Sequence, residues 1–228
     1  MNSNENLSYD LITNEKNDFI IPTSSYMKLL DITETPLKVV GVIGKESSVT
    51  NYMISKLSQK DLSNYKSQNN KDLLVKNKDN IMYLNAIIGN WSEEFINTIS
   101  DFVILMMDNE DKSTYNILRE IKRSNKEIKV KYVIHNSKEN NHITEESLIL
   151  NFQVKKCNKG DISYFIDYID KDNKNDYIIH YILNDNIDMI VEEISKDITY
   201  IKGKKFNIIN KIRDYIENNL KKETNTTL

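Results

Sequence analysis

The sequence is poor in the residues that cross-link a fold or shape its turns. It has 1 cysteine, 5 glycines and 2 prolines among 228 residues. The lone Cys157 excludes an intramolecular disulfide framework and is typical of a reducing compartment. With so little glycine and proline, the turns must rely on asparagine, aspartate and serine.

Long apolar runs and an excess of one charge are missing too. No apolar run reaches the roughly 18 residues that a membrane-spanning helix needs. The first residues, MNSNENLSYD, lack the basic and apolar regions of a signal peptide. The net charge is only -3, with lysines and acids interspersed, so there is no nucleic-acid-binding signature. We expect a cytoplasmic or nuclear protein with no membrane span.

What the sequence does contain is an alternation of apolar runs with amphipathic segments. Strands are expected at 37–43, 72–76, 81–87, 102–107, 130–135 and 177–183. Helices are expected after Ser47 or Ser48 as caps, at 91–99, after Ser113, and at 143–150, 187–194 and 206–220. The segment 151–154 reads as a further strand, and 162–169 fits a helix or a strand. On the helix after Ser48, one apolar face is expected to contain Val49, Tyr52, Met53 and Leu57.

This alternation predicts an α/β fold with three layers, in which helices cover both faces of a mostly parallel sheet. No proline- or glycine-rich linker divides the chain, so residues 21–222 are expected to form a single domain. Residues 1–20 and 223–228 are polar, and we expect both segments to be disordered.

Residues 41–48, GVIGKESS, connect an apolar strand to a helix. A phosphate-binding loop at such a place reads G-x-x-x-x-G-K-[ST]. When the frame starts at Gly41, Glu46 replaces the second glycine and Ser47 replaces the lysine. Ser48 keeps the hydroxyl that would hold Mg²⁺. The sequence therefore has the position of a phosphate loop without its main phosphate-binding charge.

This loop and the order of elements resemble a Ras-like P-loop GTPase over roughly residues 36–222. The resemblance implies a second loop, D-x-x-G, after the third strand. Asn85 stands in place of its aspartate, and Gly89 follows one residue late. It also implies a third loop, N-K-x-D, after the fifth strand. There Asn136 matches, Ser137 replaces the lysine, and Glu139 replaces the aspartate that contacts guanine.

Two narrower resemblances rest on short segments. Ile134-His135-Asn136, His180 to Asn184 and Phe206-Asn207 are similar to divergent GTPase-like proteins of protists. The segments MKLLD, VVGVIG and FVILMMD are similar to the degenerate G domain of a nonsense-mediated-decay scaffold. Both comparisons point to a GTPase-like domain with altered motifs.

The same residues also have simpler interpretations that involve no ligand. Gly41 and Gly44 fit strand-end glycines of any α/β protein, Ser48 fits a helix cap, and Asn136 fits a turn. The histidines at 135, 142 and 180 lack zinc-site spacing among themselves and with Cys157. His180, on a buried strand, is expected to be a hydrogen-bonded core residue.

Three hypotheses for the function follow. The first is a catalytically inactive, GTPase-like domain that serves as a protein-interaction or regulatory module. Its partners would be other proteins, such as a true GTPase or a multi-subunit complex, and no cofactor is expected. The second is an atypical switch that binds GTP or GDP with Mg²⁺, using Gly41, Gly44, Lys45, Ser47, Ser48, Asn136 and Glu139. The third is an unrelated α/β protein, such as a receiver-like or small-molecule module. A receiver would need paired acids at the end of its first strand, and Gly41 to Gly44 offers none.

Overall fold

The structure is a computed structural model that describes residues 8–10, 13–15, 18–20, 36–62, 73–76, 80–88, 96–107, 116, 119, 121–123, 127–135, 144–183, 186–205, 209–215 and 217. The strands are β1 (Ser8–Asp10), β2 (Thr13–Glu15), β3 (Asp18–Ile20), β4 (Lys38–Gly44), β5 (Leu73–Lys76), β6 (Ile81–Ile87), β7 (Phe102–Met107), β8 (Lys129–His135), β9 (Lys155–Lys159), β10 (Ile162–Tyr168) and β11 (Tyr177–Leu183). The helices are α2 (Ser47–Ser58), α5 (Glu145–Phe152) and α6 (Ile187–Thr199). Residues 96–99 and 209–215 are also helical.

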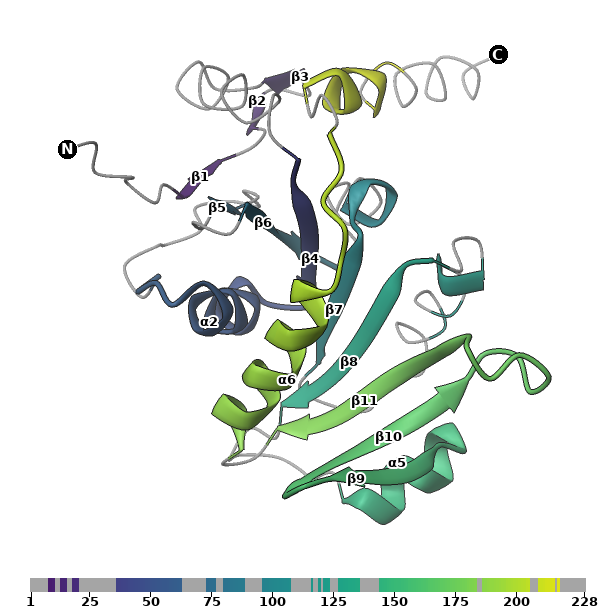
Figure 1. Ribbon diagram of the computed structural model, residues 1–228. Helices are drawn as coiled ribbons and strands as arrows, with labels where there is room; N and C mark the ends of the chain where they lie inside the picture. The colour runs from purple at the N-terminus through teal and green to yellow at the C-terminus, as the bar shows by residue number, and fades with distance from the viewer. Residues whose placement is uncertain are drawn as a thin grey trace.

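A nine-stranded sheet in the order β1-β5-β6-β4-β7-β8-β11-β10-β9 forms the centre of the fold (Figure 1). The strands from β6 to β11 in that order run parallel to one another. Antiparallel strands extend the sheet at both ends, with β5 and β1 on one side and β10 and β9 on the other. The predicted α/β fold with a parallel central sheet is therefore confirmed.

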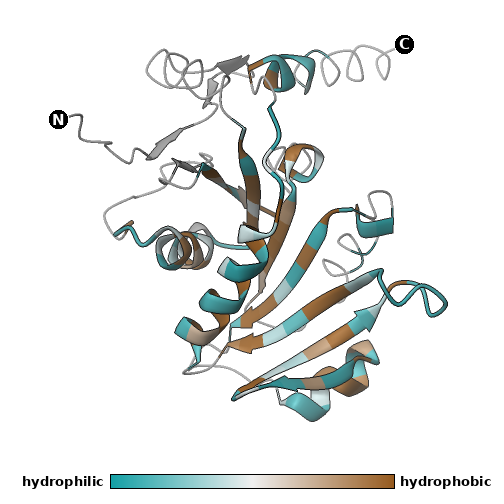
Figure 2. Ribbon diagram, in the orientation of Figure 1, coloured by the Kyte–Doolittle hydropathy of each residue, from teal (hydrophilic) through white to brown (hydrophobic). Residues whose placement is uncertain are grey.

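The central strands are apolar because both of their faces are covered. Every residue of β7 is buried, and so is every residue of β4 after Lys38. Figure 2 shows this concentration of apolar residues along the middle of the sheet and a mostly hydrophilic outer side of α6. Continuous apolar runs such as FVILMM predicted these strands correctly.

Helices lie on both faces of the sheet. On one face, α2 and α6 pack on β4 and β7 through a cluster that includes Val42, Met53, Ile104 and Ile190. On the other face, a second cluster includes Val39, Ile43, Leu148 and Phe152 of α5, and Ile209 and Ile212. The C-terminal helix predicted at 206–220 therefore contributes buried residues to the face opposite α6.

The helix α6 has the clearest amphipathic pattern. Its buried residues Ile190, Ile194 and Ile198 recur every fourth position, which places them on one stripe toward the sheet. After α6 the chain returns to β4, where the backbone N–H and C=O groups of Leu37 and Lys204 pair at 2.9 and 2.8 Å. No helix in the described part of the chain is long and apolar enough to cross a membrane.

Several local predictions are wrong. The segment 151–154 is not a strand, because α5 continues to Phe152 and Gln153 then adopts a left-handed conformation with φ 54°. Neither Ser47 nor Ser48 caps α2, since Glu46 holds that position. Tyr52 is 41% exposed, so it does not belong to the buried face of α2, where Ile54 is buried instead.

For other segments the structure decides between alternatives or changes the predicted bounds. The ambiguous segment 162–169 forms β10, which pairs with β9 and β11. The helix predicted at 187–194 extends to Thr199. Within residues 1–20, expected to be disordered, the structure has the short strands β1, β2 and β3. The predicted cap at Ser113 and the helix start at Trp91 lie outside the described residues.

Candidate functional site

The carboxyl ends of the parallel strands are the expected location of a ligand site in an open α/β sheet. Here that edge is formed by the ends of β4, β6, β7, β8 and β11. Among the described residues, it includes Gly44, the turn that leads into α2, and His135 at the end of β8. The segments that follow β6, β7 and β8 begin outside the described residues after Ile88, Met107 and His135.

The turn between β4 and α2 is short. Strand β4 continues through Gly44 and α2 begins at Ser47, so only Lys45 and Glu46 lie between them. Gly44 stays in register with Ile87 of β6, and its carbonyl accepts a hydrogen bond from Ile88 N–H at 2.9 Å. Residues 41–44 are therefore part of the sheet, whereas a phosphate cradle requires backbone N–H groups that point into a loop.

Glu46 occupies the N-terminus of α2. Its backbone is extended, with φ -128° and ψ 138°, and its carbonyl accepts from Thr50 N–H at 3.3 Å. Its carboxylate accepts a hydrogen bond from the Ser48 hydroxyl, with 3.3 Å between Ser48 Oγ and Glu46 Oε2. The N-cap residue of α2 is thus an acid, although its side chain makes no capping hydrogen bond to the helix, and the hydroxyl proposed to hold Mg²⁺ donates to its carboxylate.

The two glycines of the motif allow close contacts between helices and the sheet. A Cβ atom at Gly41 would lie 2.4 Å from Ile96 Cγ2 and 2.7 Å from Ser100 Oγ. A Cβ atom at Gly44 would lie 2.7 Å from Thr50 Cγ2, on α2, and 3.1 Å from the carbonyl oxygen of Met106. At each position the nearest atom lies closer than 3.0 Å, so packing alone favours glycine at both.

Asn85, which stands in place of the D-x-x-G aspartate, lies inside the sheet. It faces Val42 across the β4–β6 pair and is 1% exposed. Its side-chain N–H group donates to Asn51 Oδ1 of α2 at 3.0 Å. The amide therefore joins β6 to α2 within the core, while Gly89 lies outside the described residues.

For the third predicted loop, N-K-x-D, the structure describes only His135, the residue that precedes it. His135 ends β8, and its ring meets the Tyr52 ring edge-on, with 6.5 Å between centroids. Lys56 lies 5.9 Å from the same Tyr52 ring and pairs with Asp188 of α6 at 3.0 Å. Asn136, Ser137 and Glu139 lie outside the described residues. Of the predicted residues, Lys45 lies in the turn between β4 and α2, Gly44 ends the strand before it, and Ser47 and Ser48 begin the helix after it.

Sequence reasoning did not find the Tyr52–His135 contact. The pair joins α2 to the end of β8, far apart in the sequence, and the apolar periodicity of α2 assigned Tyr52 to the core. No group of three or more histidine, cysteine, aspartate or glutamate side chains placed to hold a metal ion occurs in the described part of the chain.

A comparison of the chain with models of known protein families gives no match, and neither does a comparison with curated proteins.

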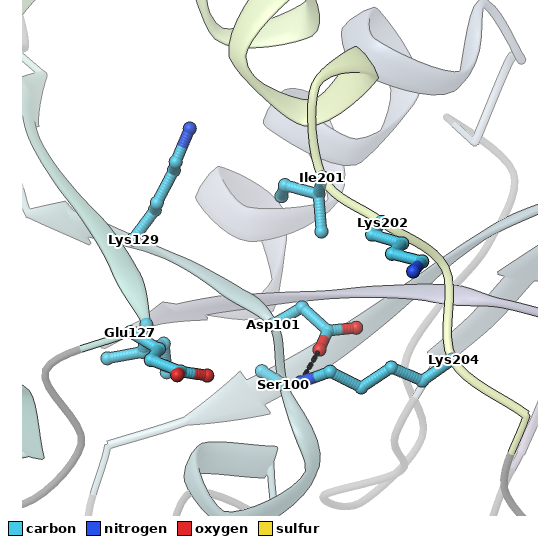
Figure 3. Close-up of a pocket in the computed structure, with 8 residues that line it drawn as sticks. Ser100, Asp101, Glu127, Lys129, Ile201, Lys202 and Lys204 are labelled. Atoms are coloured by element: carbon cyan, nitrogen blue, oxygen red, sulfur yellow. Dashed lines mark ion pairs between the residues drawn. The ribbon is translucent and has the colours of Figure 1, made fainter.

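A small hollow of about 240 Å³ lies at the opposite edge of the sheet, where β7 and β8 begin (Figure 3). It is lined by Ser100, Asp101, Glu127, Ile128, Lys129, Ile201, Lys202 and Lys204. The ammonium group of Lys204 pairs with Asp101 Oδ1 at 2.9 Å, and this contact raises the pKa of Lys204. Asp101 also accepts from Val39 N–H at 3.1 Å. These contacts fasten the segment after α6 to the start of β7.

Proposed function

We propose that this chain is a catalytically inactive, GTPase-like domain that acts as a protein-interaction or regulatory module. The order of its strands supports the GTPase-like part of the proposal. From β5 to β11 the order is β5-β6-β4-β7-β8-β11, and β5 is the only antiparallel member of this group. A Ras-like G domain arranges its strands in the same order and directions. In this chain the antiparallel hairpin of β9 and β10 is inserted before the last of them.

The position of Glu46 is the main support for catalytic inactivity. In a phosphate loop, backbone N–H groups and a lysine surround the phosphates, and a helix N-terminus adds a favourable dipole. Here a carboxylate lies at that N-terminus and accepts from Ser48. Two negative groups about 4 Å apart repel each other by about 1 kcal/mol in water and by more in a partly buried site. A phosphate would therefore have to displace the glutamate side chain.

Asn85, which replaces the aspartate that would order Mg²⁺, supports the same conclusion. Asn85 is neutral and buried, and its amide is bonded to Asn51. A neutral amide is a weaker partner for a hard cation than a carboxylate. Phosphoryl transfer depends on positioned charges, so a site that lacks both the lysine and the aspartate should not turn over GTP. The remaining use of such a domain is contact with other proteins, for which a true GTPase or a multi-subunit complex is a natural candidate.

The test is isothermal titration of the purified chain with GTP, GDP and ATP, with and without Mg²⁺, next to a phosphate-release assay. We expect no heat of binding and no hydrolysis. The matched variants are Glu46→Gln, which removes the repelling charge, and Lys45→Ala, which removes the exposed lysine of the turn. Magnesium-dependent GTP hydrolysis by the wild-type chain would overturn the proposal.

The variants separate the two nucleotide readings. Micromolar, guanine-selective binding that disappears in Lys45→Ala would favour the atypical switch, with Lys45 in the role of the missing lysine. Binding that appears only in Glu46→Gln would show that the carboxylate alone closes the site, and the wild-type chain would still be inactive.

A further inference from the structure

Strand β9 (Lys155–Lys159) is the last strand of the sheet. It pairs with β10 on one side, and no other described strand pairs with it. In an antiparallel pair, alternate residues direct their N–H and C=O groups away from the partner strand. The outer side of β9 therefore presents backbone donors and acceptors to which an added strand can bind.

The residues of β9 are accessible. Lys155, Lys156, Asn158 and Lys159 are exposed, and Cys157 is half-buried. The hairpin turn that follows is shaped by Gly160, whose φ of +60° favours glycine. The edge is therefore an ordered strand of five residues, longer than the three-residue β1 at the other end of the sheet.

The charge of β9 has one sign. Its sequence, KKCNK, contains three lysines in five residues and no acid. Lys156 and Lys159 pair with Glu145 and Glu193, on the two helices that flank the edge. Both members of the Lys156–Glu145 pair are exposed, and such solvent-screened pairs are worth little, so Lys156 can exchange partners readily. An acidic strand laid along this edge would gain a charge complement at alternate positions.

An apolar side chain of α5 lies on the side of the helix that meets the same edge. The ion pair between Lys156 and Glu145 places the first turn of α5 next to β9. On α5, Ile149 is 38% exposed. Ile149 follows Glu145 by one helical turn and so shares its side of the helix. Exposed aliphatic groups next to an open strand edge are typical of a surface that a partner covers.

We propose that the β9 edge and the exposed face of α5 bind an extended, acidic segment of a partner protein, which adds a strand to the sheet. The backbone of the segment pairs with β9, its carboxylates meet the lysines, and its aliphatic residues contact Ile149. This inference rests on the proposed interaction function, to which it assigns a surface and a kind of partner.

A second copy of the chain is a poorer occupant of this edge. The antiparallel register that pairs the whole of β9 with itself is centred on Cys157 and puts Lys155 opposite Lys159. Like charges directly opposite each other destabilise a strand pair. An acidic partner has no such repulsion.

The experiment uses the full chain and a synthetic peptide in which glutamate and valine alternate. Amide hydrogen exchange, resolved by NMR, reports which β9 residues gain protection. We expect alternate amides among residues 155–159 to be protected at saturating peptide. A peptide with lysine in place of glutamate, and an acidic peptide interrupted by prolines, which cannot donate to a ladder, should give no protection.

Matched variants locate the contact. Lys155→Glu reverses the charge of an exposed β9 lysine, and we expect it to weaken peptide affinity about tenfold. Its control is Lys171→Glu, an equally exposed lysine in the turn before β11, which should leave affinity unchanged. Ile149→Ser should also weaken binding, whereas Tyr200→Ser, at an 83% exposed position at the end of α6, should not.

Three outcomes would overturn the inference: unchanged exchange of the β9 amides, equal protection by the lysine peptide, or a dimer in solution that Lys155→Glu dissociates. These outcomes leave the proposed function intact, because an inactive domain can bind partners elsewhere. Conversely, GTP hydrolysis would refute the proposed function without altering the exchange of β9.

Discussion

The side-chain amide of Asn85 donates a hydrogen bond to Asn51 Oδ1 over 3.0 Å, inside the core between β6 and α2. Asn85 is 1% exposed and Asn51 is 8% exposed. A buried polar group that loses its partner costs about 1–3 kcal/mol, whereas replacing both partners by apolar groups is nearly neutral. The pair therefore connects the two elements only while both members are present.

Asn85→Leu should accordingly lower the free energy of unfolding by about 2 kcal/mol, because Asn51 is left without this donor. The double variant Asn51→Leu/Asn85→Leu should recover most of that loss. Urea denaturation of the wild type, both single variants and the double variant gives the coupling energy. Additivity within about 0.5 kcal/mol would contradict a direct interaction.

Gly41 offers a test of the packing role given to the motif glycines. Gly41→Ala places a methyl group 2.4 Å from Ile96 Cγ2, and overpacking of this kind costs about 1–3 kcal/mol. Ile96→Ala is itself costly because Ile96 is buried, but it removes the opposing methyl group, so the double variant should be less destabilised than the sum of the two single variants. Thermal or urea unfolding measures both effects.

The control for that substitution is Gly203→Ala. Its Cβ atom would meet the backbone of Leu37 and Pro36 at an ordinary 3.4 Å, so the change should be small. If Gly41→Ala were as stable as Gly203→Ala, the glycine would not be required by the approach of residues 96–100 to the sheet. A role in a loop would then regain support.

The core of this fold could be predicted because its strands are continuous apolar runs. FVILMM and KVVGVIG have no other stable place than a sheet covered on both faces. The edge strands carried a weaker signal. β9, with the sequence KKCNK, has neither apolar character nor alternation, and its pairing with β10 depends on the turn at Gly160. Local patterns therefore missed the hairpin that extends the sheet.

The site was harder to predict because motif spacing gives no information on where a strand ends. The spacing from Gly41 to Ser48 fits a phosphate loop, yet β4 continues through Gly44 because β6 and β7 extend beside it. The same spacing could not reveal that Glu46, and not a serine, precedes the first turn of α2. Tertiary pairing decides both features.

We expect the free energy of unfolding to fall in acid because of His180. It is fully buried beside Tyr132 and Phe152, at ring distances of 5.2 and 5.6 Å. Burial, with a smaller contribution from Arg119, lowers its pKa to about 3. The unfolded chain binds this proton near pH 6.5, and the folded chain does not. The stabilisation is therefore present above about pH 6.5 and is lost as the pH falls toward about 3.

His180→Phe keeps a ring between the two aromatic neighbours and removes the titration. We expect the stability of the wild type relative to this variant to fall by up to about 1.4 kcal/mol per pH unit below about pH 6.5. Urea midpoints at several pH values measure the slope for both proteins. Parallel slopes, or an NMR signal assigned to His180 that titrates near pH 6.5 in the folded wild type, would contradict a buried neutral His180.

The last prediction concerns Lys131, a lysine on β8 that is buried under α6. Its side chain is 4% exposed, and its ammonium group lies 2.5 Å from Asp197 Oδ2 and 5.7 Å from the Tyr181 ring centroid. Burial lowers the pKa of Lys131, while Asp197 opposes that shift. Asp197→Asn should destabilise the fold by about 2 kcal/mol, less than the about 3–5 kcal/mol of a fully buried pair, because Asp197 is 37% exposed.

Replacing Lys131, the other partner of the pair, should have a smaller effect. The carboxylate then left on Asp197 is partly exposed and can be hydrated, whereas the ammonium group of Lys131 is buried and cannot. Lys131→Met should therefore cost less than Asp197→Asn, and Lys131→Met/Asp197→Asn should resemble Lys131→Met alone. Glu192→Gln, which breaks an exposed pair with Lys196 on the same helix, serves as control and should change stability by no more than about 0.5 kcal/mol. Since the folded pKa of Lys131 is lowered, Asp197→Asn should also regain stability as the pH rises. Equal costs for the two single variants would show that the pair behaves as a solvent-screened surface contact.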